Sequence, residues 1–275
     1  YLDDGRIRRV TGCLTPERPA GCLPHERPAG CLPHERGKSR LDFSSATLLP
    51  GLIDAHVHLV FSGTADPEVR RRQLDYEDAV AGSVIRDHID ALARAGVVAV
   101  RDGGDHHGHV LRCWQASGGT WPVRVRTAGR AWHAPGRYGR LIGRPPEPGG
   151  SLDESIRRDL SPIHHVKIVA SGLNSLETFG KTTPPQFSGP ELAEAVRTAT
   201  AMGRRVMVHA NGPEAVGAAV AAGCHSVEHG FFMGREAMGR MAEAGTVWVP
   251  TAVTMRGYAQ AAGDTRAEQS RRDVA

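Results

Sequence analysis

The sequence predicts an α/β fold: a (β/α)8 TIM-type barrel, incomplete at its C-terminus, with a remnant of a small N-terminal β-sandwich. Three observations support this prediction. From residue 47 onward, strand-like segments alternate with helix-like segments. The strand-like segments are apolar throughout, which is typical of parallel strands buried on both faces. Polar residues follow these segments at the strand ends where such barrels carry their active sites.

Seven strand–helix steps, the last one incomplete, favour a closed barrel over an open sheet. The expected strands are residues 47–59, 97–101, 123–128, 166–170, 205–209, 226–228 and 246–251. The expected helices are residues 76–96, 110–116, 151–160, 190–203, 213–223 and 234–245. Two long loops, 130–150 and 172–189, interrupt the alternation, and loops of that length inside a compact domain are often functional. No Gly-x-Gly-x-x-Gly follows the first strand, which disfavours a dinucleotide-binding fold.

Residues 1–46 are predicted to be a partial β-sandwich segment, and residues 47–275 to be the barrel without its last strand. Residues 3–10 predict a turn followed by a short strand. A nonapeptide that begins with cysteine recurs through residues 13–37. Zinc sites usually contain closer cysteine pairs, and each copy is rich in proline and glycine, so an exposed insertion is favoured over a metal loop.

The composition limits the class of protein. The chain is 40% hydrophobic and 23% charged with a net charge of +4, which is typical of a globular protein. No basic stripe alternates with aromatic residues, and no apolar run reaches membrane-spanning length, so we expect neither nucleic-acid nor membrane binding. Five cysteines without a paired framework favour a reduced, cytoplasmic setting. Because the chain begins at Tyr1, a signal peptide upstream stays an open alternative.

Nitrogen-bearing side chains lie on or just after four of the predicted strands. His56 and His58 are two residues apart on a strand, so both side chains face the same side. With His209 and His229 they form a set that suits zinc, iron, nickel or cobalt better than magnesium. Lys167 would be strongly disfavoured as an ammonium among cations. Its amine can react with CO2 to give an anionic carbamate with two oxygens, and the alternative is a lysine that snorkels toward solvent or pairs with an acid.

Four segments resemble the amidohydrolase superfamily. Residues 49–58, Leu-Pro-Gly-Leu-Ile-Asp-Ala-His-Val-His, resemble its first-strand signature. Residues 206–212, Val-Met-Val-His-Ala-Asn-Gly, and 226–230, Ser-Val-Glu-His-Gly, resemble its fifth- and sixth-strand motifs. Residues 97–104, Val-Val-Ala-Val-Arg-Asp-Gly-Gly, resemble strand 2 of the imidazolonepropionase-like and Xaa-Pro dipeptidase-like branch. The resemblance spans about residues 41–255.

This resemblance implies a site with two divalent metal ions, which we expect to be zinc. His56 and His58 would bind the more buried metal, His209 and His229 the second, and carboxylated Lys167 would bridge them. A hydroxide held between the metals would attack a metal-polarised carbonyl carbon and cleave a carbon–nitrogen bond of the amide type. Two alternatives stay open: a mononuclear deaminase of the same superfamily, against which Lys167 argues, and an inactive truncated relative.

The family's further ligand and proton shuttle, an aspartate at the end of strand 8, has no counterpart that the sequence identifies. Asp264 and Asp273 follow the seventh expected strand, but neither comes after an apolar segment. The catalytic acid is therefore unassigned. A chain truncated before strand 8 is expected to bind metal weakly and to have little hydrolase activity by itself.

The loop of residues 130–150 is expected to face the substrate. His133 and Tyr138 are its candidate substrate-binding residues, and its arginines have the geometry to bind a carboxylate with two parallel hydrogen bonds. We therefore expect a small-molecule amide or dipeptide-like substrate; a homo-oligomer is left open. His106, His107 and His109 follow the second strand and are expected to lie in a solvated loop.

Overall fold

A computed structural model describes residues 2–3, 6–7, 46–47, 49–64, 66–174 and 180–253 of the 275-residue chain. The chain divides into two units, residues 1–50 and residues 51–275. In the first unit, β1 (Leu2–Asp3) and β2 (Arg6–Ile7) pair antiparallel. The repeat of residues 13–37 lies outside the described residues.

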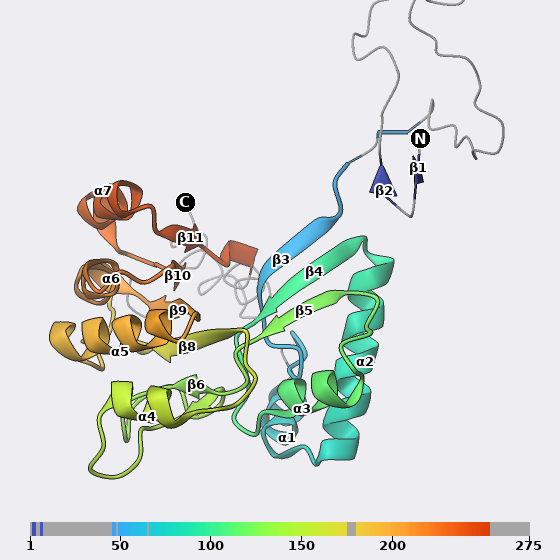
Figure 1. Ribbon diagram of the computed structural model, residues 1–275, viewed down its shortest axis with the longest axis horizontal. Helices are drawn as coiled ribbons and strands as arrows, with labels where there is room; N and C mark the ends of the chain where they lie inside the picture. Colours follow the sequence, from blue (N-terminus) through green and yellow to red (C-terminus); the bar gives the residue numbers. More distant parts are fainter. Residues whose placement is uncertain are drawn as a thin grey trace, which may run out of the picture. The chain divides into compact units, whose positions relative to one another are not determined.

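In the second unit, parallel strands form a curved wall (Figure 1). Its long strands are β3 (Leu52–Val57), β4 (Val97–Asp102), β5 (Arg124–Thr127), β8 (His165–Val169), β9 (Arg205–Ala210), β10 (Ser226–His229) and β11 (Val247–Val249). Together with the short strands β6 (Ala131–Trp132) and β7 (Gly143–Arg144), they belong to two sheets, β3-β4-β5 and β11-β10-β9-β8-β6-β7, in which every paired strand is parallel.

Hydrogen bonds between Thr127 and His164 join the two sheets. His164 N donates to Thr127 O over 2.9 Å, and Thr127 N donates to His164 Nδ1 over 3.2 Å. The strands therefore follow one another round the wall in chain order, which is the order of a (β/α)8 barrel. The predicted partial barrel is confirmed.

Helices cover the outside of this wall. They are α1 (Pro67–Arg72), the 3-10 turn η1 (Gln73–Asp75), α2 (Asp78–Arg94), α3 (His109–Ala116), α4 (Leu152–Arg158), α5 (Gly189–Ala201), α6 (Gly212–Ala221) and α7 (Gly234–Ala244). Helix α2 buries Ala81, Ile85 and Ile89, which recur every four residues and so share one helix face. Helices α4 and α5 begin with capping boxes at Ser151 and Ser188.

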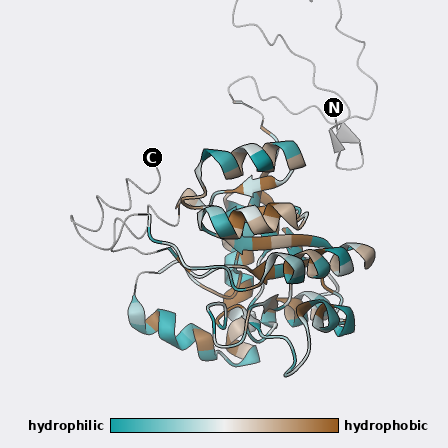
Figure 2. Cartoon of the chain, turned by 90° about the vertical axis from the view of Figure 1, so that its left-hand side faces the viewer, coloured by the Kyte–Doolittle hydropathy of each residue, from teal (hydrophilic) through white to brown (hydrophobic). Residues whose placement is uncertain are grey.

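The core lies where the strands meet these helices. All five residues of β8 are buried, and its apolar side chains Val166 and Ile168 pack in one cluster with the buried faces of α5 and α6. Figure 2 shows the hydrophobic colour concentrated on the strands and the hydrophilic colour on the helices' outer faces. The outermost strands are the exception, because Ile53 on β3 and Val247 on β11 are 70% and 56% exposed.

The structure contains elements that the sequence did not predict. Helix α1 and η1 lie between the first strand and α2, and two short strands, β6 (Ala131–Trp132) and β7 (Gly143–Arg144), lie within the predicted loop of residues 130–150. These strands are only two residues long, which gives a periodicity argument nothing to detect. Among the described residues, no helix is long and apolar enough to cross a membrane.

Candidate active site

Four of the predicted histidines lie together at one edge of the wall. His56 on β3 has its ring centroid 5.3 Å from that of His58 and 4.9 Å from that of His229. The His209 ring, from β9, is 4.5 Å from the His229 ring. The four come together because the C-terminal ends of parallel strands meet at the same edge of a barrel.

Lys167 lies among these histidines. It projects from β8, its side chain is 1% exposed, and its Nζ is buried without a hydrogen-bond partner among the described residues. Its charge lowers the pKa of all four histidines. Burial in turn lowers the pKa of Lys167 to about 8, against the opposing attraction of Glu228. A buried amine without a partner is costly, and so it marks the place where a ligand or a modification is expected.

The four histidines are held in the neutral form. Burial is the largest cause in each ring: it lowers the pKa of His58 to about 4 and that of His209 to about 3. The pKa values of His56 and His229 also fall well below the ordinary value. At neutral pH all four imidazoles are therefore uncharged, which is the form that binds a metal ion.

A protein oxygen fixes one nitrogen of each ring. His58 Nδ1 is 2.7 Å from Gly104 O, His209 Nε2 is 3.2 Å from Gly172 O, and His229 Nδ1 is 2.6 Å from Thr251 Oγ1. The other nitrogen of each ring is left for a second partner. Proteins commonly orient metal-binding imidazoles in this way.

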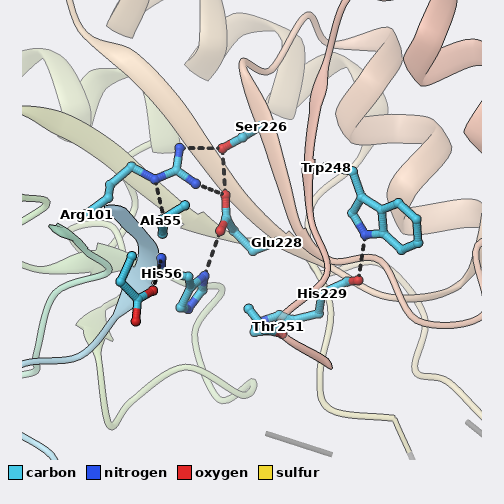
Figure 3. A network of polar contacts seen from close by, with 9 residues as sticks. Ala55, His56, Arg101, Ser226, Glu228, His229, Trp248 and Thr251 are labelled. Carbon is cyan, nitrogen blue, oxygen red and sulfur yellow. Dashed lines mark hydrogen bonds and ion pairs between the residues drawn. The ribbon is translucent and has the colours of Figure 1, made fainter. Parts of the chain in front are cut away.

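Glu228 fixes the fourth ring, and the sequence analysis did not single it out. Its carboxylate is fully buried, and Oε2 accepts a hydrogen bond from His56 Nδ1 over 2.6 Å. Its Oε1 accepts from Arg101 Nη2 over 2.5 Å and from Ser226 Oγ over 2.6 Å. Arg101 also donates to Ala55 O, so a single polar network that includes His56 joins β3, β4 and β10 (Figure 3).

The backbone at His229 explains why Glu228 was missed. Successive residues of a regular strand face opposite sides, so His229 inside the barrel predicts Glu228 outside it. His229 instead has a φ of 68°, in the left-handed region, and this breaks the alternation. Both side chains then face His56. One feature of the sequence could have identified Glu228 as a site residue: it is a charged residue inside a short strand that is otherwise buried.

Asp102 supports the site from the end of β4. Its buried carboxylate accepts hydrogen bonds from Leu59 N, Gly104 N and Thr127 Oγ1, at 3.0, 3.1 and 2.8 Å. Burial raises the pKa of Asp102 to about 7. The carboxylate thus holds in place the Gly104 segment, whose carbonyl orients His58.

The two candidate substrate-binding residues, His133 and Tyr138, differ in whether they contact the histidine cluster. The Tyr138 ring is 5.6 Å from the His209 ring, beside the histidine cluster. His133 is buried, its Nδ1 is 2.9 Å from Ala134 O, and its Nε2 is buried with no hydrogen-bond partner in the described part of the chain. No hydrogen bond or ring contact between described residues joins His133 to the four histidines.

The remaining expectations concern two aspartates near the C-terminus and the histidines that follow β4. Asp264 and Asp273 lie outside the described residues. The expected solvated loop is wrong for His109, which is 5% exposed with Nδ1 2.8 Å from Asp78 Oδ1. His109 is the first residue of α3, and its ring is buried because the first turn of this helix packs against the interior.

The cluster fits a metal ion in the chemistry of its donors. Neutral imidazoles with one nitrogen left over, around an amine without a partner, are suited to a cation and an anionic bridge. Among the described residues, no three His, Cys, Asp or Glu side chains form a group arranged to hold a metal ion. Lys167 is not one of these four residue types, so a site of two histidines and a modified lysine falls outside that description.

Comparison with known proteins gives a consistent result. Residues 47–264 match the amidohydrolase family. An imidazolonepropionase of Acidiphilium cryptum is 30% identical over 237 residues, which cover 76% of this chain and 57% of that relative. A crystal structure of a Xaa-Pro dipeptidase with bound methionine in the active site is 25% identical with a TM-score of 0.62; the match covers 82% of this chain and 59% of that one. A crystal structure of an amidohydrolase, 23% identical with a TM-score of 0.68, shares the fold over 88% of this chain and 63% of its own. The chain thus spans little more than half the length of these relatives.

Proposed function

The chain belongs to the amidohydrolase family, and on that premise we propose that it is a metal-dependent hydrolase that cleaves a carbon–nitrogen bond of the amide type. One observation carries the proposal: four uncharged histidines surround a buried lysine amine that has no partner among the described residues. A site built only for stability would pair that amine with an acid.

We assign His56 and His58 to one divalent metal ion, zinc, and His209 and His229 to a second. Lys167 would contribute to both as a carbamate: its Nζ lone pair forms a bond to the carbon of CO2 as one C–O π pair moves onto oxygen, the nitrogen loses one proton to water, and the product is an anion with two oxygens. When bound, such metal ions polarise a carbonyl group and lower the pKa of water.

The chain's own residues orient and support this site. The Glu228 carboxylate accepts from His56 Nδ1 and so leaves Nε2 as the ring nitrogen with a free lone pair. Arg101 balances the charge of that buried carboxylate and anchors it to β3 through Ala55 O. We propose that Asp102, through Gly104, performs the matching task for His58.

The proposed substrate is a small amide or dipeptide-like molecule. His133 has a buried Nε2 that no described residue contacts by a hydrogen bond, and this nitrogen is suited to a hydrogen bond with the substrate. Tyr138 lies beside His209, at the edge where the substrate carbonyl would lie. The names of the relatives suggest Xaa-Pro dipeptides and imidazolonepropionate as the first compounds to test.

A second candidate, an inactive relative, is favoured by the absence, in the described part of the chain, of a histidine or carboxylate group already spaced for metal. Hydrolysis of a panel of Xaa-Pro dipeptides, N-acyl amino acids and imidazolonepropionate by the zinc-loaded chain separates the two. The control variants are His56→Ala in the cluster and His107→Ala, which replaces an exposed histidine before α3.

We expect zinc-dependent release of product by the original chain and by His107→Ala, and its loss in His56→Ala. The difference in product release between His56→Ala and His107→Ala, and not the absolute rate of hydrolysis, decides between a hydrolase and an inactive relative. If all three proteins give the same background release across the panel, the hydrolase proposal is wrong and the inactive relative is supported.

A further inference from the structure

A cavity of about 300 Å³ lies on the outside of the wall, between α3 and residues 159–163. Three arginines line it together with Asp159: Arg112 from α3, Arg130 after β5, and Arg144 from β7. None of the four clustered histidines, Lys167 or Glu228 lines this cavity. It is therefore distinct from the candidate active site.

Two of the three arginines already have acidic partners. Arg112 Nη2 is 2.5 Å from Asp78 Oδ1, and Arg144 Nη2 is 2.8 Å from Asp159 Oδ2. Arg130 has no hydrogen bond or ion pair with any described residue, and its Nε is buried. The lining holds three arginines and Asp159, and Asp78 pairs with Arg112 from outside it, so these five groups sum to a formal charge of +1.

The arrangement leaves cationic donors unsatisfied. The Nε of Arg144 is buried without a hydrogen-bond partner among the described residues, as is that of Arg130. Burial and the charges of Arg144 and Arg112 lower the pKa of Arg130, while Asp105 and Asp159 act in the opposite direction. Unlike Arg112 and Arg144, Arg130 has no acidic partner within ion-pair distance among the described residues, so its guanidinium is the group with which an anion in the cavity would pair.

The cavity also has an apolar side, formed by Leu111, Pro162 and Ile163. Gly129, with a φ of 66°, allows this side to close in: a Cβ there would lie 2.9 Å from Ile163 Cγ2 and 3.2 Å from Leu111 Cδ2. Guanidinium groups and an apolar surface therefore line the same small cavity.

We propose that this cavity binds a small organic phosphate, with the phosphate on Arg130 and its neighbours and the apolar part of the ligand on Leu111 and Ile163. Guanidinium forks match the oxygens of a phosphate with paired, charge-assisted hydrogen bonds. A phosphate monoester offers three terminal oxygens to the guanidinium groups of the lining, one more than a carboxylate does.

Isothermal titration calorimetry with phenyl phosphate tests this proposal on the full chain. The protein is first stripped of metal and desalted, so that the result does not depend on the proposed hydrolase function. We expect saturable binding of phenyl phosphate, weaker binding of inorganic phosphate and of benzoate, and no binding of phenol. Absence of phenyl phosphate binding at millimolar concentration overturns the proposal, and benzoate binding as tightly as phenyl phosphate overturns its assignment to phosphates.

Arg130→Gln locates the site, with Arg235→Gln on the exposed surface of α7 as the control that removes the same charge. We expect affinity for phenyl phosphate to fall at least about tenfold in Arg130→Gln and to be unchanged in Arg235→Gln. Arg130→Lys, which keeps the charge and loses the planar fork, should lie between them and serves if the glutamine variant does not fold. Equal affinity in all three variants contradicts the assignment to this cavity.

Discussion

At the scale of single residues, the candidate site depends on which nitrogen of each histidine is already occupied. Glu228 occupies Nδ1 of His56, and backbone or hydroxyl oxygens occupy one nitrogen of each of the other three rings. The positions of His56, His58 and Lys167 were predictable, because strand periodicity determines which side chains share a face. The partners were not, because they come from residues distant in sequence: Glu228 is 172 positions from His56.

Glu228→Gln tests the role of this carboxylate. The amide keeps the size of the side chain but removes the charge that holds His56 and Arg101, so we expect zinc affinity to fall about 10- to 100-fold. Equilibrium dialysis with a fluorescent zinc competitor measures the change. The matched control, Glu243→Gln, alters an exposed glutamate on α7 and should leave zinc affinity unchanged. Equal zinc affinity in both variants would show that Glu228 does not position the site.

At the scale of elements, β10 shows how a local backbone irregularity builds the site. His229 and Gly230 both have positive φ, 68° and 65°, so β10 ends in a left-handed turn. Trp248 of β11 covers this turn by donating from Nε1 to His229 O over 2.8 Å. The sequence predicted the strand and its neighbours from their apolar runs, but the turn depends on this contact with the next strand, which no local pattern encodes.

Gly230→Ala tests this turn. A Cβ at Gly230 would lie 2.8 Å from Trp248 Nε1 on a backbone with positive φ, so we expect the free energy of unfolding to fall by about 1–3 kcal/mol. Gly239→Ala is the control: it lies within α7 with no atom near its added Cβ, and should raise that energy by about 0.5–1 kcal/mol. Urea unfolding of both variants measures the difference. The same sign of change in the two variants would contradict the strained turn.

At the scale of the whole molecule, we expect buried histidines to dominate the dependence of stability on pH. Burial lowers the pKa of His165 to about 3, of His209 to about 3 and of His58 to about 4, and those of His56 and His229 fall in the same direction. Between these values and the ordinary histidine pKa of 6.5, the unfolded chain binds more protons than the folded chain. The contribution of these histidines to the free energy of unfolding is therefore present above pH 6.5 and is lost as the pH falls.

We therefore expect the metal-free chain to lose stability steeply between pH 6.5 and pH 5. Each of these histidines contributes up to about 1.4 kcal/mol per pH unit. Asp102 opposes them: its pKa is raised to about 7, so its folded form holds an extra proton and gains stability as the pH falls from 7. Urea unfolding at pH 7, 6 and 5 measures the sum. A free energy of unfolding that stays level or rises on acidification would mean that these histidines are not held neutral.

The most direct test of the two-metal site is native mass spectrometry of the zinc-loaded chain beside its Lys167→Met variant. The variant keeps a long, buried side chain at the centre of the site but has no amine to react with CO2. The predicted result is two zinc ions and one CO2 on the original chain, with the CO2 and at least one zinc ion lost together in the variant. One zinc ion without CO2 on the original chain, or the same zinc and CO2 content in both proteins, would contradict it.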